Sequence, residues 1–83
     1  MNLVVVGSGY VGLVSGACLA DKGHRVICVD ISEERIEGLK RGKVPIYEPG
    51  LDAIIARNAD AGALSFTTSL PEAMREADIF CIA

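Results

Sequence analysis

The chain of 83 residues is shorter than a typical domain of about 100–150 residues, so we expect one compact unit and no more. Its net charge of −3 argues against nucleic acid or an anionic membrane as a partner, because both require clustered Lys and Arg. No apolar stretch approaches the ~20 residues that cross a bilayer, and the first apolar run lacks the features of a secretory signal, which predicts a soluble, cytoplasmic protein.

The first predicted strand, at residues 3–6, runs directly into the hexapeptide Gly-Ser-Gly-Tyr-Val-Gly at residues 7–12. Each glycine has a separate predicted role in a turn that receives a diphosphate. Gly7 closes the tight turn, where a side chain would demand an unfavourable positive φ. Gly9 lets the backbone approach the pyrophosphate, and Gly12 allows the following helix to pack close to the strands.

A first helix is predicted from about Tyr10 to Lys22, with a face of small residues at Gly12, Gly16 and Ala20. The amides at its N-terminus carry roughly half a positive charge, which suits a pyrophosphate without help from a basic side chain. Residues 1–20 contain no Lys or Arg.

The second predicted strand, at residues 25–29, ends at Asp30, which lies 18 residues beyond Gly12. A dinucleotide-binding unit places an acidic residue about 20 residues beyond its glycines, where the carboxylate accepts hydrogen bonds from the adenosine ribose. Asp30 would also repel a 2′-phosphate, which favours NAD over NADP. Arg35 leaves NADP open as an alternative, since its guanidinium could pair with such a phosphate.

The order of strand, glycine bend, helix, strand and acidic residue favours a dinucleotide-binding βαβ unit. The competing interpretation is an ordinary βα connection, in which Asp30 only caps the helix that follows Ser32. The coincidence of the three features in the expected order makes that interpretation the weaker one.

The remaining pattern predicts the first half of a doubly wound α/β fold, a Rossmann-type parallel sheet in the order 3-2-1-4 with flanking helices. Residues 1–83 would then be the amino-terminal part of a dinucleotide-binding domain, with the rest of the enzyme absent from this chain. The further predicted elements are a helix from Ser32 to Lys40, a rigid loop at 45–51, a helix that buries Leu51, Ile54 and Ile55, a strand at 64–67, a helix at 70–76 and a strand at 78–83.

The three cysteines, Cys18, Cys28 and Cys81, show no metal-binding or redox spacing. All three fall within apolar runs on predicted helix or strand, where free cysteine behaves as a small hydrophobe. We therefore expect none of them to be catalytic. With His24 as the single histidine, the sequence indicates no metal site.

Several of these segments together resemble the amino-terminal domain of the UDP-glucose/GDP-mannose 6-dehydrogenases, and the resemblance covers essentially the whole chain. The Tyr-Val-Gly ending of the glycine motif and the loop Glu48-Pro49-Gly50-Leu51 separate it from other dinucleotide binders. The segments that carry the resemblance are 7–13, 16–20, Gly23-His24, Val29-Asp30, 45–51 and 66–68.

This resemblance implies an enzyme that oxidises the C6 alcohol of a nucleotide sugar to a carboxylate in two successive hydride transfers to NAD. UDP-glucose is the expected substrate, with GDP-mannose as the alternative, and we expect the complete protein to be a homo-oligomer. The family's catalytic cysteine, lysine and aspartate match no residue of this chain, so we expect no catalytic residue here.

The resemblance places cofactor contacts on Val11 and Asp30, and on Arg35, where a basic residue is usual. We also expect Tyr10, within the glycine motif, to be a cofactor-binding residue. It leaves Glu48 without a firm role. We interpret the loop of Glu48 as one that aims the next helix, with approach to the cleft or to a neighbouring subunit as alternatives.

Two other classes share parts of this pattern. A non-enzymatic nucleotide-sensing domain of potassium-transport regulators has a similar first ~30 residues, but it carries a different segment after the second helix. A β-hydroxyacid dehydrogenase more often has Met where Val11 stands. Both therefore fit the chain less well.

Overall fold

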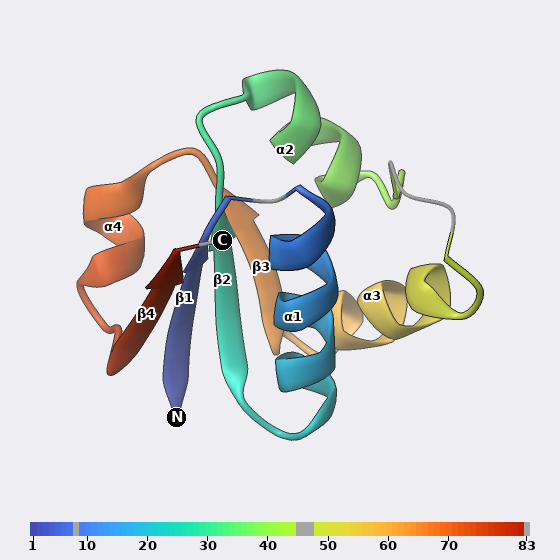
Figure 1. Cartoon of the computed structure of the whole chain (residues 1–83), viewed down its shortest axis with the longest axis horizontal. Helices are drawn as coiled ribbons and strands as arrows, with labels where there is room; N and C mark the ends of the chain where they lie inside the picture. Colours follow the sequence, from blue (N-terminus) through green and yellow to red (C-terminus); the bar gives the residue numbers. More distant parts are fainter. Residues whose placement is uncertain (8, 45–47, 83) are drawn as a thin grey trace.

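A computed structural model describes residues 1–7, 9–44 and 48–82, which form a four-stranded parallel sheet in the order β3-β2-β1-β4 (Figure 1). Both the order and the parallel pairing confirm the predicted first half of a doubly wound sheet. The elements in chain order are β1 (Asn2–Val6), α1 (Tyr10–Asp21), β2 (Arg25–Val29), α2 (Glu33–Lys40), α3 (Leu51–Asp60), β3 (Leu64–Thr67), α4 (Leu70–Met74) and β4 (Ile79–Ile82).

The predicted boundaries differ from these mainly at the last helix, which ends at Met74 and not at Glu76. The chain has to leave the helix there because the amide of Asp78 already donates to the carbonyl of Asn2, 2.8 Å away, at the start of the β1–β4 ladder. The predictions for residues 45–47 and for Ala83 lie outside the described residues.

The strands are in register, so that their carboxyl ends meet at one edge of the sheet. Val6 at the end of β1 pairs with Val29 of β2 and with Ile82 of β4. Val29 in turn pairs with Thr67 of β3. The residues that follow β1, β2 and β3 therefore start from the same edge, which is where open α/β sheets bind their ligands.

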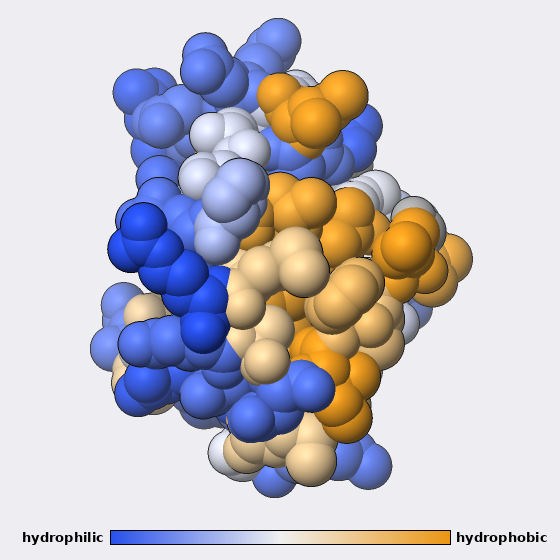
Figure 2. All heavy atoms as spheres, turned by 90° about the vertical axis from the view of Figure 1, so that its left-hand side faces the viewer, coloured by the Kyte–Doolittle hydropathy of each residue, from blue (hydrophilic) through white to orange (hydrophobic). Residues whose placement is uncertain are grey.

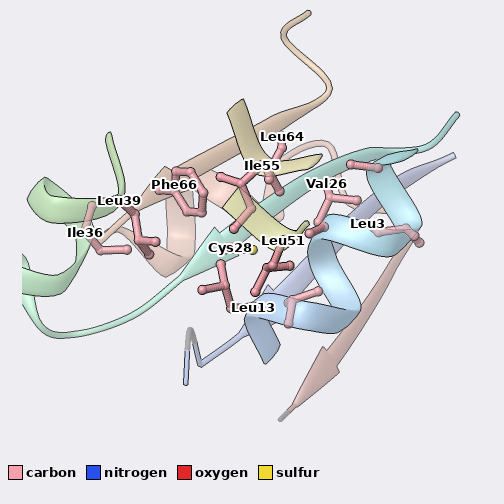
Figure 3. Close-up of a cluster of buried hydrophobic side chains, with 13 residues drawn as sticks. Leu3, Leu13, Val26, Cys28, Ile36, Leu39, Leu51, Ile55, Leu64 and Phe66 are labelled. Atoms are coloured by element: carbon pink, nitrogen blue, oxygen red, sulfur yellow. The ribbon is translucent and has the colours of Figure 1, made fainter. Parts of the chain in front are cut away.

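Each face of the sheet has its own hydrophobic core. Val5 of β1 points into the larger core, beneath α1, α2 and α3, whereas Val4 points to the other face and packs with Ala73 of α4. Both valines are only 1% exposed, so the central strand is buried on both sides as expected for a parallel sheet. Figure 3 shows the larger core, which includes Leu3, Leu13, Val26, Cys28, Ile36, Leu39, Leu51, Ile55, Leu64 and Phe66.

Helix α3 packs against α1 through one face. Leu51 and Ile55 are buried as predicted, whereas Ile54 is only half-buried. Asn58 is buried on the same face, and its amide donates to the Ile54 carbonyl and to the carboxylate of Asp21 at the end of α1. Arg57 pairs with the same Asp21 oxygen, so the two helices are tied at their ends by polar contacts as well as by the core.

The side of the molecule formed by α4 and β4 carries much exposed hydrophobic surface (Figure 2). All four residues of β4 are exposed, because this strand pairs only with β1 in the described sheet. Phe80 is 50% and Ile82 81% exposed, although both belong to a strand. Within the described residues, every helix is too short or too polar to cross a bilayer.

Candidate cofactor-binding site

The bend that follows β1 begins at Gly7, whose φ of 100° lies in the left-handed region that strains any residue with a Cβ. The Gly7 amide donates to the carbonyl of Val29 over 2.6 Å, so the bend stays attached to the end of β2. The conformational requirement predicted for Gly7 is therefore confirmed.

The backbone angles that require a glycine at position 7 are not present at Gly9. Its φ of −71° and ψ of −167° are extended values that any residue adopts. A Cβ on Gly9 would nevertheless point into open space, with no heavy atom within 4 Å. This geometry suits a position where a group from outside the chain approaches the backbone closely.

The first turn of α1 presents amides that the helix itself does not use. Among the described residues, the first backbone bond of the helix runs from the Leu13 amide to the Gly9 carbonyl, and the amides of residues 10–12 precede it. Gly9, the N-cap, offers no side-chain acceptor, and the first turn contains no acidic residue. The positive end of this 12-residue helix is thus available to an anion.

The small residues of α1 bring the helix close to the sheet. Gly12, Gly16 and Ala20 are all buried, as predicted. At Gly16 an added Cβ would lie only 2.8 Å from Sγ of Cys28 on β2. The close packing of α1 therefore holds its N-terminus directly beyond the carboxyl end of β1.

Asp30 follows β2 directly and is fixed by its neighbours. Its amide donates to the Thr67 carbonyl at 3.2 Å, which continues the pairing between β2 and β3. Its Oδ1 accepts a hydrogen bond of 2.9 Å from the Ser32 amide, a turn that leads into α2. Asp30 thus shapes the turn just before α2, as in the competing interpretation, although the N-cap of the helix itself is Ser32.

Arg35 lies in the first turn of α2, and its Nη1 is 3.1 Å from Oδ2 of Asp30. The Asp30 side chain is 11% exposed and that of Arg35 is 45% exposed, so the pair lies at the edge of the protein. Ser32 caps α2 by accepting from the Arg35 amide at 3.2 Å, which fixes where the arginine leaves the helix. The structure therefore brings together the two residues whose opposing charges left the choice between NAD and NADP open.

A single cavity of about 250 Å³ connects the glycine bend with the acidic residue. Gly7 contributes to one part of its wall and Asp30 to another, as expected from the shared edge of β1 and β2. The other lining residues are Val6, Val29, Ile31, Thr68 and Leu70.

All five of these other lining residues were missed as site residues from the sequence. Ile31 is 95% exposed, which is unusual for an isoleucine directly after a buried strand. The sequence signal that could have identified Ile31 is its position as an apolar residue directly after the acidic residue that ends the strand. Thr68 lies in the connection after β3 and Leu70 begins α4, and only the sheet order places them here.

The side chains of Tyr10 and Val11 are 53% and 65% exposed on the first turn of α1. Tyr10 donates a hydrogen bond of 3.1 Å to Glu48. The carboxylate raises the pKa of Tyr10, because it accepts this bond from the phenol and because its charge opposes that of a phenolate.

The cysteines are not alike, which corrects the sequence-based expectation. Cys28 is buried in the core, and this burial raises the pKa of its thiol to about 12. Cys18 and Cys81 are exposed, on the outer side of α1 and on β4. The apolar runs around them indicated burial, but Cys18 lies off the buried stripe of its helix and Cys81 on a strand that has only one partner.

Known proteins are similar to this chain in sequence and in fold. Residues 1–83 match the model of the UDP-glucose/GDP-mannose dehydrogenase family, NAD-binding domain. Over all 83 residues the chain is 51% identical to UDP-glucose 6-dehydrogenase of Rhizobium meliloti, and over 79 residues it is 42% identical to GDP-mannose 6-dehydrogenase of Pseudomonas aeruginosa. It spans only 19% and 18% of these two proteins.

Two solved structures are similar over nearly the whole chain. One is GDP-mannose dehydrogenase from Pseudomonas aeruginosa in a ternary complex, with a TM-score of 0.95 at 41% identity, of which the chain covers 19%. The other is a UDP-glucose dehydrogenase from Pyrobaculum islandicum, with a TM-score of 0.92 at 41% identity and again 19% covered. The chain therefore belongs to the UDP-glucose/GDP-mannose dehydrogenase family and corresponds to its NAD-binding domain.

Proposed function

We propose that this chain binds NAD at the carboxyl edge of its sheet, with the pyrophosphate at residues 7–12 and the adenosine ribose at Asp30. The observation that carries the proposal is the cavity that Gly7 and Asp30 line together. The open space at Gly9 and the unused amides of α1 fit a diphosphate, which would complete the N-terminus of the helix.

Of the two nicotinamide cofactors, the site favours NAD. A dianionic 2′-phosphate at the ribose would have to approach the Asp30 carboxylate, and the guanidinium that could offset this repulsion is already paired with Asp30. The ribose hydroxyls of NAD can instead donate to the carboxylate, in charge-assisted bonds of roughly 1.5–3 kcal/mol each. Arg35 then orients the Asp30 carboxylate.

For the complete protein we propose an NAD-dependent dehydrogenase that oxidises the C6 alcohol of UDP-glucose to a carboxylate. When bound, NAD supplies the acceptor for hydride, and oxidation of a primary alcohol to a carboxylate consumes one water and transfers two hydrides, so that two NAD are reduced. The part of this chain is to bind and orient the adenosine end of the cofactor. UDP-glucose is favoured because the R. meliloti UDP-glucose enzyme is 51% identical to the chain.

GDP-mannose is the second candidate substrate. A GDP-mannose dehydrogenase is among the solved structures similar to this chain, with a TM-score of 0.95. The family match favours both dehydrogenases over the regulatory nucleotide-sensing domain.

The assay that tests this proposal follows NADH formation by the intact protein with UDP-glucose or GDP-mannose in parallel. We expect two NADH per UDP-glucose and little turnover with GDP-mannose. Turnover of GDP-mannose alone would select the second candidate, and hydride transfer from neither sugar nucleotide would contradict the proposed activity. Direct titration with NAD tests the binding site independently of the substrate.

A further inference from the structure

The hydrogen bond between Tyr10 and Glu48 joins two parts of the chain that are 38 residues apart. Tyr10 is the first residue of α1 and therefore belongs to the turn that presents amides to the proposed pyrophosphate. Glu48 lies in the turn that leads into α3. The bond thus connects the bend that follows β1, which we call the cofactor bend, to the turn before α3, an element outside the βαβ unit.

The backbone of Glu48 is held firmly enough to serve as an anchor. Its carbonyl accepts from the Leu51 amide at 3.1 Å, and Gly50, with a φ of 83°, forms the N-cap of α3. Leu51 and Ile55 on this helix are only 4% and 2% exposed, in the same core as Leu13 of α1. The position of Glu48 is therefore coupled to α1 through the packing of the two helices.

The N-terminus of α1 has no side-chain cap, so a contact such as the Tyr10–Glu48 bond matters more there than at most helix N-termini. Gly9 has no side chain with which to cap the helix, and the first turn carries no acidic side chain. A cap of the usual kind would occupy the amides that a pyrophosphate requires. The Tyr10–Glu48 bond instead ties the first turn through a side chain that is 53% exposed and does not involve those amides.

We propose that Glu48 is a positioning residue for the cofactor bend: by accepting the Tyr10 hydroxyl it holds the first turn of α1 in the geometry that presents its amides. This inference rests on the proposed binding of NAD at the bend. The charge of Glu48 acts in the opposite direction, because an anion near the positive end of α1 weakens the attraction of that end for a second anion. A neutral acceptor at residue 48 separates these two effects.

The test is calorimetric titration of the intact protein with NAD. We expect Glu48→Ala and Tyr10→Phe each to weaken binding about three- to tenfold, the range of one hydrogen bond. The double variant should be no weaker than either single one, because both remove the same bond. Glu48→Gln retains an acceptor and should restore the affinity to that of the natural protein or above it. Glu76→Ala, which removes an exposed carboxylate beyond α4, is the matched control and should leave NAD affinity unchanged.

A spectroscopic readout separates positioning from a general effect on folding. The pKa of Tyr10 lies above its usual value because of the hydrogen bond to Glu48 and the charge of Glu48. Titration of the Tyr10 ring-carbon NMR signal should therefore move towards the usual value in Glu48→Ala, and by less in Glu48→Gln, which keeps an acceptor. Glu76→Ala should not move it. Thermal unfolding of each variant shows that the protein titrated is folded, and Tyr10→Phe preserves the ring if Glu48→Ala does not fold.

The outcomes distinguish this inference from the proposed function. If the natural protein does not bind NAD, both are overturned. If it binds NAD and the folded Glu48→Ala and Tyr10→Phe variants bind it equally well or more tightly, only the positioning role is overturned. Weakening by Glu48→Gln equal to that by Glu48→Ala would likewise overturn it, because the acceptor would then not be what matters.

Discussion

Asp30 and Arg35 form an ion pair of 3.1 Å at the point where the second strand gives way to its helix. The other Asp30 oxygen accepts from the Ser32 amide, so both oxygens of the carboxylate are held by donors. The arginine that could have selected a 2′-phosphate is thereby engaged by the residue that repels one. Cofactor choice at this site depends on the pair and not on either residue alone.

Replacement of Asp30 by Asn tests this dependence. The amide oxygen can still accept from Ser32, but the charge that attracts Arg35 and the ribose hydroxyls is lost. We expect NAD affinity to fall about tenfold or more, the value of one charge-assisted bond. NADP affinity should rise relative to NAD, because Arg35 becomes available to the 2′-phosphate. Titration with both cofactors measures the two changes.

The double variant Asp30→Asn/Arg35→Ala is the control for the released arginine. This double variant should not show the gain in NADP affinity expected for Asp30→Asn. Its NAD affinity should remain as low as that of Asp30→Asn. Equal affinities of the natural protein for NAD and NADP, or unchanged NAD binding in Asp30→Asn, would contradict the role of Asp30.

Gly9→Ala should separate binding from folding. Alanine tolerates the backbone angles of Gly9, and its methyl group would meet no protein atom within 4 Å, so the melting temperature should stay unchanged. The methyl group would stand in the space that the proposed pyrophosphate needs, so NAD affinity should fall at least about tenfold, or about 1.4 kcal/mol. Gly7→Ala provides the contrast, because its φ of 100° should make that variant less stable as well. Full NAD affinity in Gly9→Ala would place the pyrophosphate elsewhere.

Gly16→Ala should destabilise the protein through overpacking. The new Cβ would lie 2.8 Å from Sγ of Cys28, and relief of such a contact typically costs about 1–3 kcal/mol, partly offset by the better helix propensity of Ala. Gly38→Ala on α2 is the matched control, since its Cβ would come no closer than 3.9 Å to Lys43, and it should stabilise by about 0.5–1 kcal/mol. Urea unfolding measures both. Recovery of stability in Gly16→Ala/Cys28→Ala would identify the contact, and equal stabilisation by both Ala variants would disprove it.

The three thiols should differ in reactivity. Cys18 and Cys81 are exposed, whereas Cys28 is buried with a pKa raised to about 12, so almost none of it is thiolate at mildly alkaline pH. A chromogenic disulfide reagent should therefore titrate Cys18 and Cys81 rapidly in the folded chain and Cys28 only after denaturation. The Cys28→Ala variant should show the same rapid phase as the natural chain. Rapid reaction at Cys28 without unfolding would mean that the core around α1 and β2 opens readily.

Acid should weaken the contact between α1 and α3. Hydrogen bonds from Arg57 and from Asn58 lower the pKa of Asp21 below its usual value of 3.8. Because the pKa of Asp21 is lower in the folded state than in the unfolded state, its carboxylate stabilises the fold at pH values above the unfolded-state pKa. This stabilisation is lost as the pH falls through the folded-state pKa. The difference in unfolding free energy between the natural protein and Asp21→Asn should therefore be largest near neutral pH and shrink below about pH 4. A difference that does not change with pH would show that the charge of Asp21 is not involved.

The sequence by itself determined the elements and the location of the candidate site. Periodic apolar runs, the glycine bend and Asp30 predicted the strand order 3-2-1-4, with the bend and the acidic residue at the same edge, because in a parallel sheet local pattern and topology are closely linked. Only the tertiary structure decided the contacts that join distant segments: the Tyr10–Glu48 bond, the proximity of Gly16 to Cys28 and the place of Thr68 and Leu70 in the cavity. It also decided which cysteines are exposed. These features depend on how whole elements pack, and a periodic apolar run indicates that an element has a buried face without indicating which side chains of another element will meet it.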